Sequence, residues 1–128
     1  MGREQLCHLQ ILIASGPEDL GRAVLGFAFA LAAAASGANV IVILTLQGVV
    51  WLDKDVSSAK QSFGGFLPIG DYMDMLKDRG VAIRLCSSCL EGNCKTDMGR
   101  NAATVLPYIG LVEVATQTIS RAAQTVVF

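Results

Sequence analysis

Short apolar runs alternate along the chain with longer segments that have helical periodicity. Strands are expected where aliphatic and β-branched residues cluster between turn signals, at residues 8–14, 40–46, 81–85 and 125–128. Helices are expected where apolar residues recur at helical spacing, at residues 20–36, 69–79 and about 111–122. Gly37 and Gly80 follow the first two of these segments and are the expected helix stops.

The 40–46 run (VIVILTL, starting at Val40) is continuous rather than alternating, which is typical of a strand covered on both faces. Together with the alternation of strands and helices, it predicts an α/β fold. We expect a three-layer, doubly wound, mostly parallel sheet of about five strands, with helices on both faces and one domain over residues 1–128. Residues 49–52 (VVWL) are expected to add a short strand, and residues 53–65 to form a loop.

Hydrophobic residues make up 52% of the 128 residues, which suggests doubly covered elements, an oligomer interface or a membrane segment. The apolar stretch 23–46 is interrupted by Ser36-Gly37-Ala38-Asn39, so neither half reaches the roughly 20 residues of a spanning helix. The first residues lack the order of a signal peptide, so a soluble, cytoplasmic protein with reduced cysteines is expected. A net charge of −1 argues against nucleic-acid binding.

Three of the four cysteines, Cys86, Cys89 and Cys94, lie within nine residues, directly after the predicted strand at 81–85. In open parallel sheets, ligands and reactive groups lie just beyond the carboxyl ends of the strands. Cys86 is expected at such a position, which makes the cluster the strongest candidate for chemistry in the chain.

Three interpretations of the cluster stay open on spacing alone. A C-x2-C-x4-C metal site lacks a fourth ligand, and Cys7 and His8 are expected near the opposite end of the strands. A redox pair, Cys86 and Cys89, leaves Cys94 without a role. In the third interpretation, a thiolate at the strand end attacks a sulfane sulfur, holds it as a persulfide or S-adduct, and passes it on by thiol exchange.

The chain as a whole resembles the DsrE/DsrF-like family, which includes subunits of bacterial sulfur-relay complexes. The resemblance rests on ILIASGPED near the start, SGANVIVILT, the stretch IGDYMDMLKDRGVAIRLC, and the terminal TVVF. In that family the cysteine directly after this strand carries sulfur, and the matching residue here is Cys86. Some members that handle thiosulfate have a second cysteine eight residues further on, and Cys94 matches that interval. Cys89 is not part of the pattern.

The resemblance implies a sulfur carrier or sulfurtransferase that passes persulfide or thiosulfonate sulfur between proteins. It implies TusA-like or rhodanese-like donors and acceptors, and a homo-oligomer such as a trimer or hexamer. The alternative is an oligomeric binding or assembly module whose C-x2-C-x4-C cluster binds metal or is redox-active. No cofactor is expected, and the chain has no G-x-G-x-x-G fingerprint that would indicate a dinucleotide site.

Polar residues around the cluster are candidates for binding a sulfur donor or an anion. Ser87, Ser88 and Lys95 flank the cysteines, and a lysine could attract an anionic sulfur compound. Ser15 and Gly16 follow the first strand and are expected on the same edge of the sheet as Cys86. Cys86, Cys94 and Cys89 are the candidate reactive residues.

Overall fold

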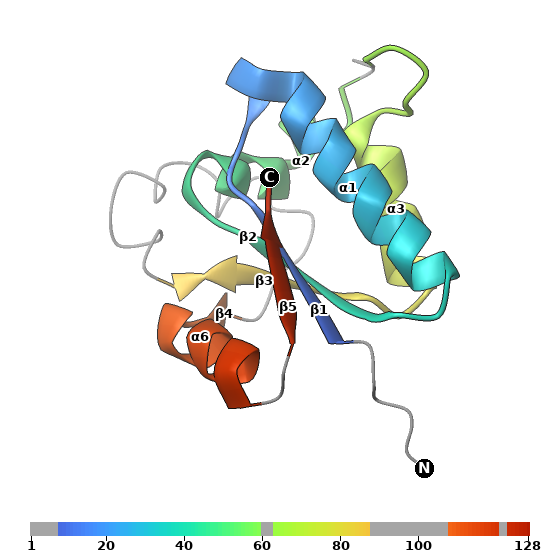
Figure 1. The fold of residues 1–128 in the computed structure, drawn as a ribbon. Helices are drawn as coiled ribbons and strands as arrows, with labels where there is room; N and C mark the ends of the chain where they lie inside the picture. Colours follow the sequence, from blue (N-terminus) through green and yellow to red (C-terminus); the bar gives the residue numbers. More distant parts are fainter. Residues whose placement is uncertain (1–7, 60–62, 88–107, 121–122) are drawn as a thin grey trace.

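Five parallel strands form one sheet in the order β4-β3-β2-β1-β5 (Figure 1). The computed structural model of the chain describes residues 8–59, 63–87, 108–120 and 123–128. The strands are β1 (His8–Ile13), β2 (Asn39–Leu44), β3 (Ala82–Cys86), β4 (Tyr108–Ile109) and β5 (Gln124–Val127). Every pair of neighbouring strands is parallel, as the continuous apolar runs predicted.

Helices cover both faces of this sheet. In Figure 1, α1 (Leu20–Ala35) and α3 (Ile69–Asp78) lie side by side on one face, and α6 (Leu111–Ser120) lies on the other. Three short elements, η1 (Pro17–Asp19), η2 (Leu46–Leu52) and α2 (Lys54–Ser57), belong to the connections between strands and helices. The three-layer, doubly wound α/β fold predicted from the sequence is therefore confirmed.

Successive residues of each strand point to opposite faces of the sheet. Ile13 faces α1, because a Cβ atom added at Gly26 of that helix would lie 2.5 Å from Ile13 Cδ1. Gln10 faces the other way, since its side-chain Nε2 donates to the Val114 carbonyl oxygen of α6 at 3.2 Å. Side chains alternate along a strand, and paired residues of parallel strands share a face. The register thus assigns a face to every residue of the sheet.

The main hydrophobic core lies between the sheet and the α1–α3 layer. Ile11 and Ile13 of β1 and Val42 and Leu44 of β2 are fully buried, and so is Phe27 of α1. α1 packs against β1, β2 and α3 (Figure 1). Small residues on this helix permit the close approach, so the apolar residues of this stretch serve to pack the helix against the sheet.

The expectation of a short strand at Val49–Leu52 was wrong, because these residues form the end of the 3-10 helix η2. Turn-type hydrogen bonds join the Gly48 N–H to the Thr45 carbonyl and the Asp53 N–H to the Val50 carbonyl, at 2.8 and 2.9 Å. The apolar side chains that suggested a strand are buried against the core instead. A short apolar run does not separate strand from helix by itself.

The segment 53–65 was expected to be a loop, but it contains α2, a single helical turn. The side chain of Asp53 accepts a hydrogen bond from the Asp55 N–H at 2.9 Å, which caps this turn. The two-residue strand β4 was not predicted at all, since two residues carry no periodicity. It pairs with β3 through Leu85–Tyr108 and Cys86–Ile109.

The approach of η2 to the end of β1 depends on glycine at position 48. A Cβ atom there would lie 1.9 Å from the Ile13 carbonyl oxygen, which is backbone and cannot turn away. Gly48→Ala should therefore lower the free energy of unfolding by at least about 2 kcal/mol, measured by urea denaturation.

Gly65→Ala is the matched control, because a Cβ atom at Gly65 meets nothing within 4 Å. Its free energy of unfolding should stay within about 0.5 kcal/mol of the parent value. Equal stabilities for the two variants would show that η2 does not pack on β1 in this way.

Candidate functional site at the carboxyl edge of the sheet

Cys86 is the last residue of β3 and lies at the carboxyl edge of the sheet. The register aligns Ile13, Leu44 and Leu85 across β1, β2 and β3. The residues that follow these three, Ala14, Thr45 and Cys86, therefore lie at the same edge of the sheet. This is the position expected for reactive groups in an open parallel sheet.

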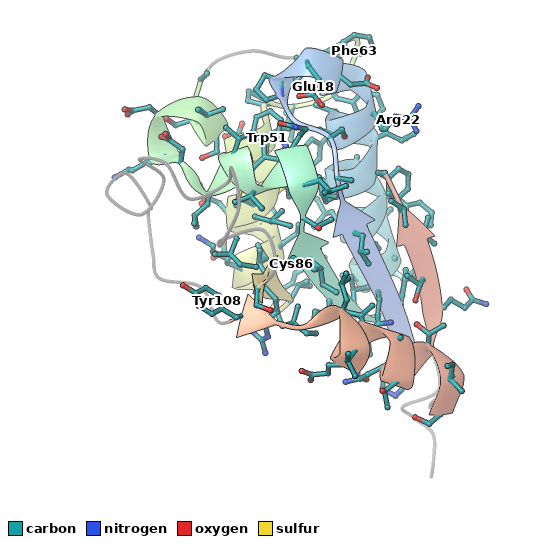
Figure 2. All side chains as sticks on the ribbon, turned by 90° about the vertical axis from the view of Figure 1, so that its left-hand side faces the viewer. Glu18, Arg22, Trp51, Phe63, Cys86 and Tyr108 are labelled. Atoms are coloured by element: carbon teal, nitrogen blue, oxygen red, sulfur yellow. The ribbon has the colours of Figure 1, made fainter. Side chains whose placement is uncertain are left out.

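The side chain of Cys86 belongs to the α6 face. Leu85 shares the α1 face with Ile13 and Leu44, so the following residue points to the opposite side. Cys86 pairs with Ile109 of β4, and α6 begins two residues later, at Leu111. Figure 2 shows Cys86 beside the β4 strand that carries Tyr108. The thiol thus lies near the N-terminal end of α6.

The thiol of Cys86 is buried, with 1% of the residue exposed. Cys86 has no disulfide partner and is a free cysteine. Ser87 follows Cys86, and its side chain lies near Gly110, the residue before α6. A Cβ atom added at Gly110 would lie 3.9 Å from Ser87 Oγ. A sulfur donor can reach the Cys86 thiol only after the groups that cover it have moved.

Ser15 and Gly16 follow β1 at the same edge as Cys86, as predicted. They lie two strands away from β3, a separation of roughly 10 Å at the usual strand spacing. The Ser15 carbonyl accepts a hydrogen bond from Trp51 Nε1 at 2.8 Å, which holds η2 against this turn. Among the described residues nothing pairs with the Ser15 hydroxyl, although Ser15 is only 6% exposed.

The turn at Gly16 already contains a carboxylate. The Gly16 N–H donates to Glu18 Oε2 at 3.0 Å, and the Asp19 side chain accepts from the Arg22 N–H at 3.4 Å. The N–H groups proposed to bind an external anion are therefore occupied by the chain's own acidic side chains in this structure. An anionic ligand would have to displace Glu18.

The other predicted site residues, Cys89, Cys94, Ser88 and Lys95, lie outside the described residues, so their roles stay predictions. In the described ranges, no three His, Cys, Asp or Glu side chains come together as a metal site would require. Nor does any helix in those ranges combine the length and apolar character needed to cross a bilayer.

His8 lies at the amino end of β1, paired with Asn39. Its expected position, away from Cys86, is confirmed. Sequence reasoning did not identify Trp51 as a residue that supports the carboxyl edge. A tryptophan in an apolar run is a weak signal, but its indole N–H needs an acceptor when it is buried, which gives it a positioning role.

Residues 8–125 match the model of the DsrE/DsrF-like family. The chain belongs to this family. The match covers β1 to β4 and the first residues of β5, and it includes Cys86 at the end of β3.

Two solved structures are similar to the chain in fold. The ychN protein from E. coli has a TM-score of 0.62 at 20% identity, over 94% of this chain and 99% of that one. A conserved protein of unknown function from Bacteroides thetaiotaomicron has a TM-score of 0.59 at 16% identity, over 94% of each chain. No curated protein matches the chain.

Two buried polar residues should respond oppositely to truncation. Ser15→Ala removes a hydroxyl that has no partner among the described residues, so the free energy of unfolding should stay the same or rise by up to about 1 kcal/mol. Gln10→Ala removes a side chain that hydrogen-bonds to α6 and β5, and should lower it by about 2–3 kcal/mol. Urea denaturation of both variants measures the difference, and a marked loss for Ser15→Ala would mean that its hydroxyl has a stabilising partner.

Proposed function

We propose that the chain carries sulfur on Cys86 and passes it between partner proteins. The observation that supports this most directly is the position of Cys86, a free thiol at the carboxyl end of β3 in a DsrE/DsrF-like fold. This family is generally associated with sulfur relay. The substrate is then a sulfane sulfur, held on a donor protein as a persulfide or a thiosulfonate.

The proposed loading step is a thiol exchange. The Cys86 thiolate attacks the sulfane sulfur of a donor persulfide, a new S–S bond forms on Cys86, and the donor cysteine leaves as a thiolate. No net oxidation or reduction takes place, because the sulfane sulfur only moves from one thiol to another. With a thiosulfonate donor, the same attack transfers the sulfane sulfur together with its sulfonate group.

In the release step, a second thiol attacks the sulfur held on Cys86. We propose Cys94 or the cysteine of an acceptor protein for this role, with Cys89 assisting. TusA-like and rhodanese-like proteins are the proposed donors and acceptors, and Ser87, Ser88 and Lys95 the proposed contacts to the transferred group.

The start of α6 supports a negatively charged adduct at this position. The N-terminal end of a helix has unpaired N–H groups and a partial positive charge, which favour an anion. Cys86 pairs with Ile109, and the helix begins just beyond it, at Leu111. A persulfide or thiosulfonate on Cys86 would place its charge close to this end of α6.

The burial of Cys86 favours a second candidate function. A cysteine that is 1% exposed can also be an unreactive residue of the hydrophobic core, as free cysteines often are. The chain would then be an oligomeric binding or assembly module, with a metal-bound or redox-active cluster as the further possibility. The two functions differ in whether the folded protein accepts sulfur.

Intact mass after incubation with polysulfide, thiosulfate or tetrathionate tests the proposed function. The reduced, metal-free protein should gain the mass of a sulfur atom or a thiosulfonate group, and the gain should disappear on reduction. Cys86→Ser should abolish it, because no other thiol is proposed to accept the first sulfur.

Cys94→Ser is the matched control in the same cluster. It should load as fast as the parent and differ in the rate at which sulfur passes to an acceptor thiol. Full loading of Cys86→Ser would overturn the choice of nucleophile. No loading of the parent would favour the assembly module, and bound zinc or iron in the untreated protein would favour the metal cluster.

The proposed homo-oligomer draws support from the outer face of α6. Val112 and Ile119 lie two turns apart on this helix and are 81% and 82% exposed. Exposed large apolar side chains on one face are typical of a protein interface.

Light scattering coupled to gel filtration should therefore give a mass that is a multiple of the chain mass. Ile119→Lys should shift it toward the monomer, because a charge would be buried in the contact. Ser120→Lys, an exposed neighbour on the same helix, should leave the mass unchanged. A monomeric parent protein would exclude this interface.

A further inference from the structure

A cavity of about 310 Å³ lies at the amino edge of the sheet, at the opposite end of the strands from Cys86. The amino ends of β1 and β2 and the later part of α6 meet at this end of the molecule (Figure 1). Its walls comprise His8, Leu9, Gln10, Asn39, Val40, Ile41, Gly80, Ala82, Gln117 and Ala123. The volume is in the range of small-molecule sites, at its lower end.

Gln10 supplies a hydrogen-bond acceptor held in a fixed place. Its Nε2 lies 3.2, 3.0 and 3.0 Å from the Val114 carbonyl oxygen and the hydroxyls of Thr118 and Thr125, and its two hydrogens are shared among these three acceptors. These contacts fix the orientation of the amide. Its Oε1 has no hydrogen bond among the described residues, although Gln10 is only 3% exposed and lines the cavity. An amide oxygen without a partner among the described residues is an acceptor available to a ligand N–H.

His8 supplies a donor. The Asn39 amide nitrogen lies 3.2 Å from His8 Nδ1, and an amide NH₂ group only donates. With the Asn39 amide nitrogen as the donor, Nδ1 is the acceptor, and Nε2 is then the ring nitrogen that can donate to a ligand. Within the part of the chain that the structure describes, Nε2 has no partner, and neither does the side-chain amide of Gln117.

The described residues that line the cavity carry no carboxylate, lysine or arginine. A charged ligand would find no countercharge among these described residues, which makes its loss of hydration costly. A neutral ligand with both a donor and an acceptor would satisfy the unpaired groups, and its apolar part would contact Val40, Ile41 and Ala82.

We propose that this cavity binds a small neutral molecule with a primary amide or a similar adjacent donor and acceptor, such as a planar carboxamide. The ligand N–H donates to Gln10 Oε1, and the ligand carbonyl accepts from His8 Nε2 or from the amide of Gln117. The site is separate from Cys86 and does not depend on the sulfur-carrier function.

Nicotinamide and nicotinate are a matched pair of probes, because they share a ring and differ in a neutral amide against a carboxylate. In a titration followed by ¹H–¹⁵N correlation spectra, nicotinamide should bind with a millimolar dissociation constant. The shifted signals should come from residues 8–10, 39–41, 82 and 117. Nicotinate should bind at least about tenfold more weakly.

Gln117→Leu should weaken nicotinamide binding about three- to tenfold, because it removes one polar partner and keeps the volume. Thr116→Ala, on the exposed side of the same helix, should leave the affinity unchanged. The proposal fails if nicotinamide causes no shifts at millimolar concentration or if nicotinate binds equally well. It also fails if the shifts centre on Cys86 and Ser87.

Discussion

The parallel register of β1, β2 and β3 is the constraint on which the rest of the structure depends. It aligns Ile13, Leu44 and Leu85, and so places the ends of three strands at one edge. A shift of one residue in β3 would move Cys86 to the α1 face, where the main hydrophobic core lies. Such a shift would move every side chain of β3 to the opposite face of the sheet. It is opposed because the fully buried residues of β1 and β2 would then lose the apolar side chains of β3 beside them.

A second constraint determines what lies on the other face. Gln10 fastens α6 to the sheet through Val114 and Thr118, and reaches β5 through Thr125. The hydroxyls of Thr118 and Thr125 are also 2.7 Å apart, so the contact is a small network rather than a single bond. Hydrogen bonds of this kind define one orientation of the helix, where apolar contacts alone would permit several. The start of α6 is thereby held near Cys86.

The sequence predicted those parts of the fold that have a long, regular pattern. The continuous run of β2 and the helix spans ending before Gly37 and Gly80 were identified to within a residue or two. The short elements were missed, because η2 looks like a strand in a single apolar window and β4 has only two residues. The edge position of Cys86 followed from strand direction alone. Its burial could not be predicted, since that depends on segments distant in sequence, and neither could the cavity beside His8 and Gln10.

The length of the central strands also sets how far the two ends of the sheet can influence each other. β1 has six residues and spans about 20 Å, and its interior residues are packed on both sides. Groups this far apart without shared contacts usually contribute additively to the free energy. Changes at the two edges should therefore add in free energy, except for changes that act on α6, which Gln10 fastens to the sheet and whose first residues lie near Cys86.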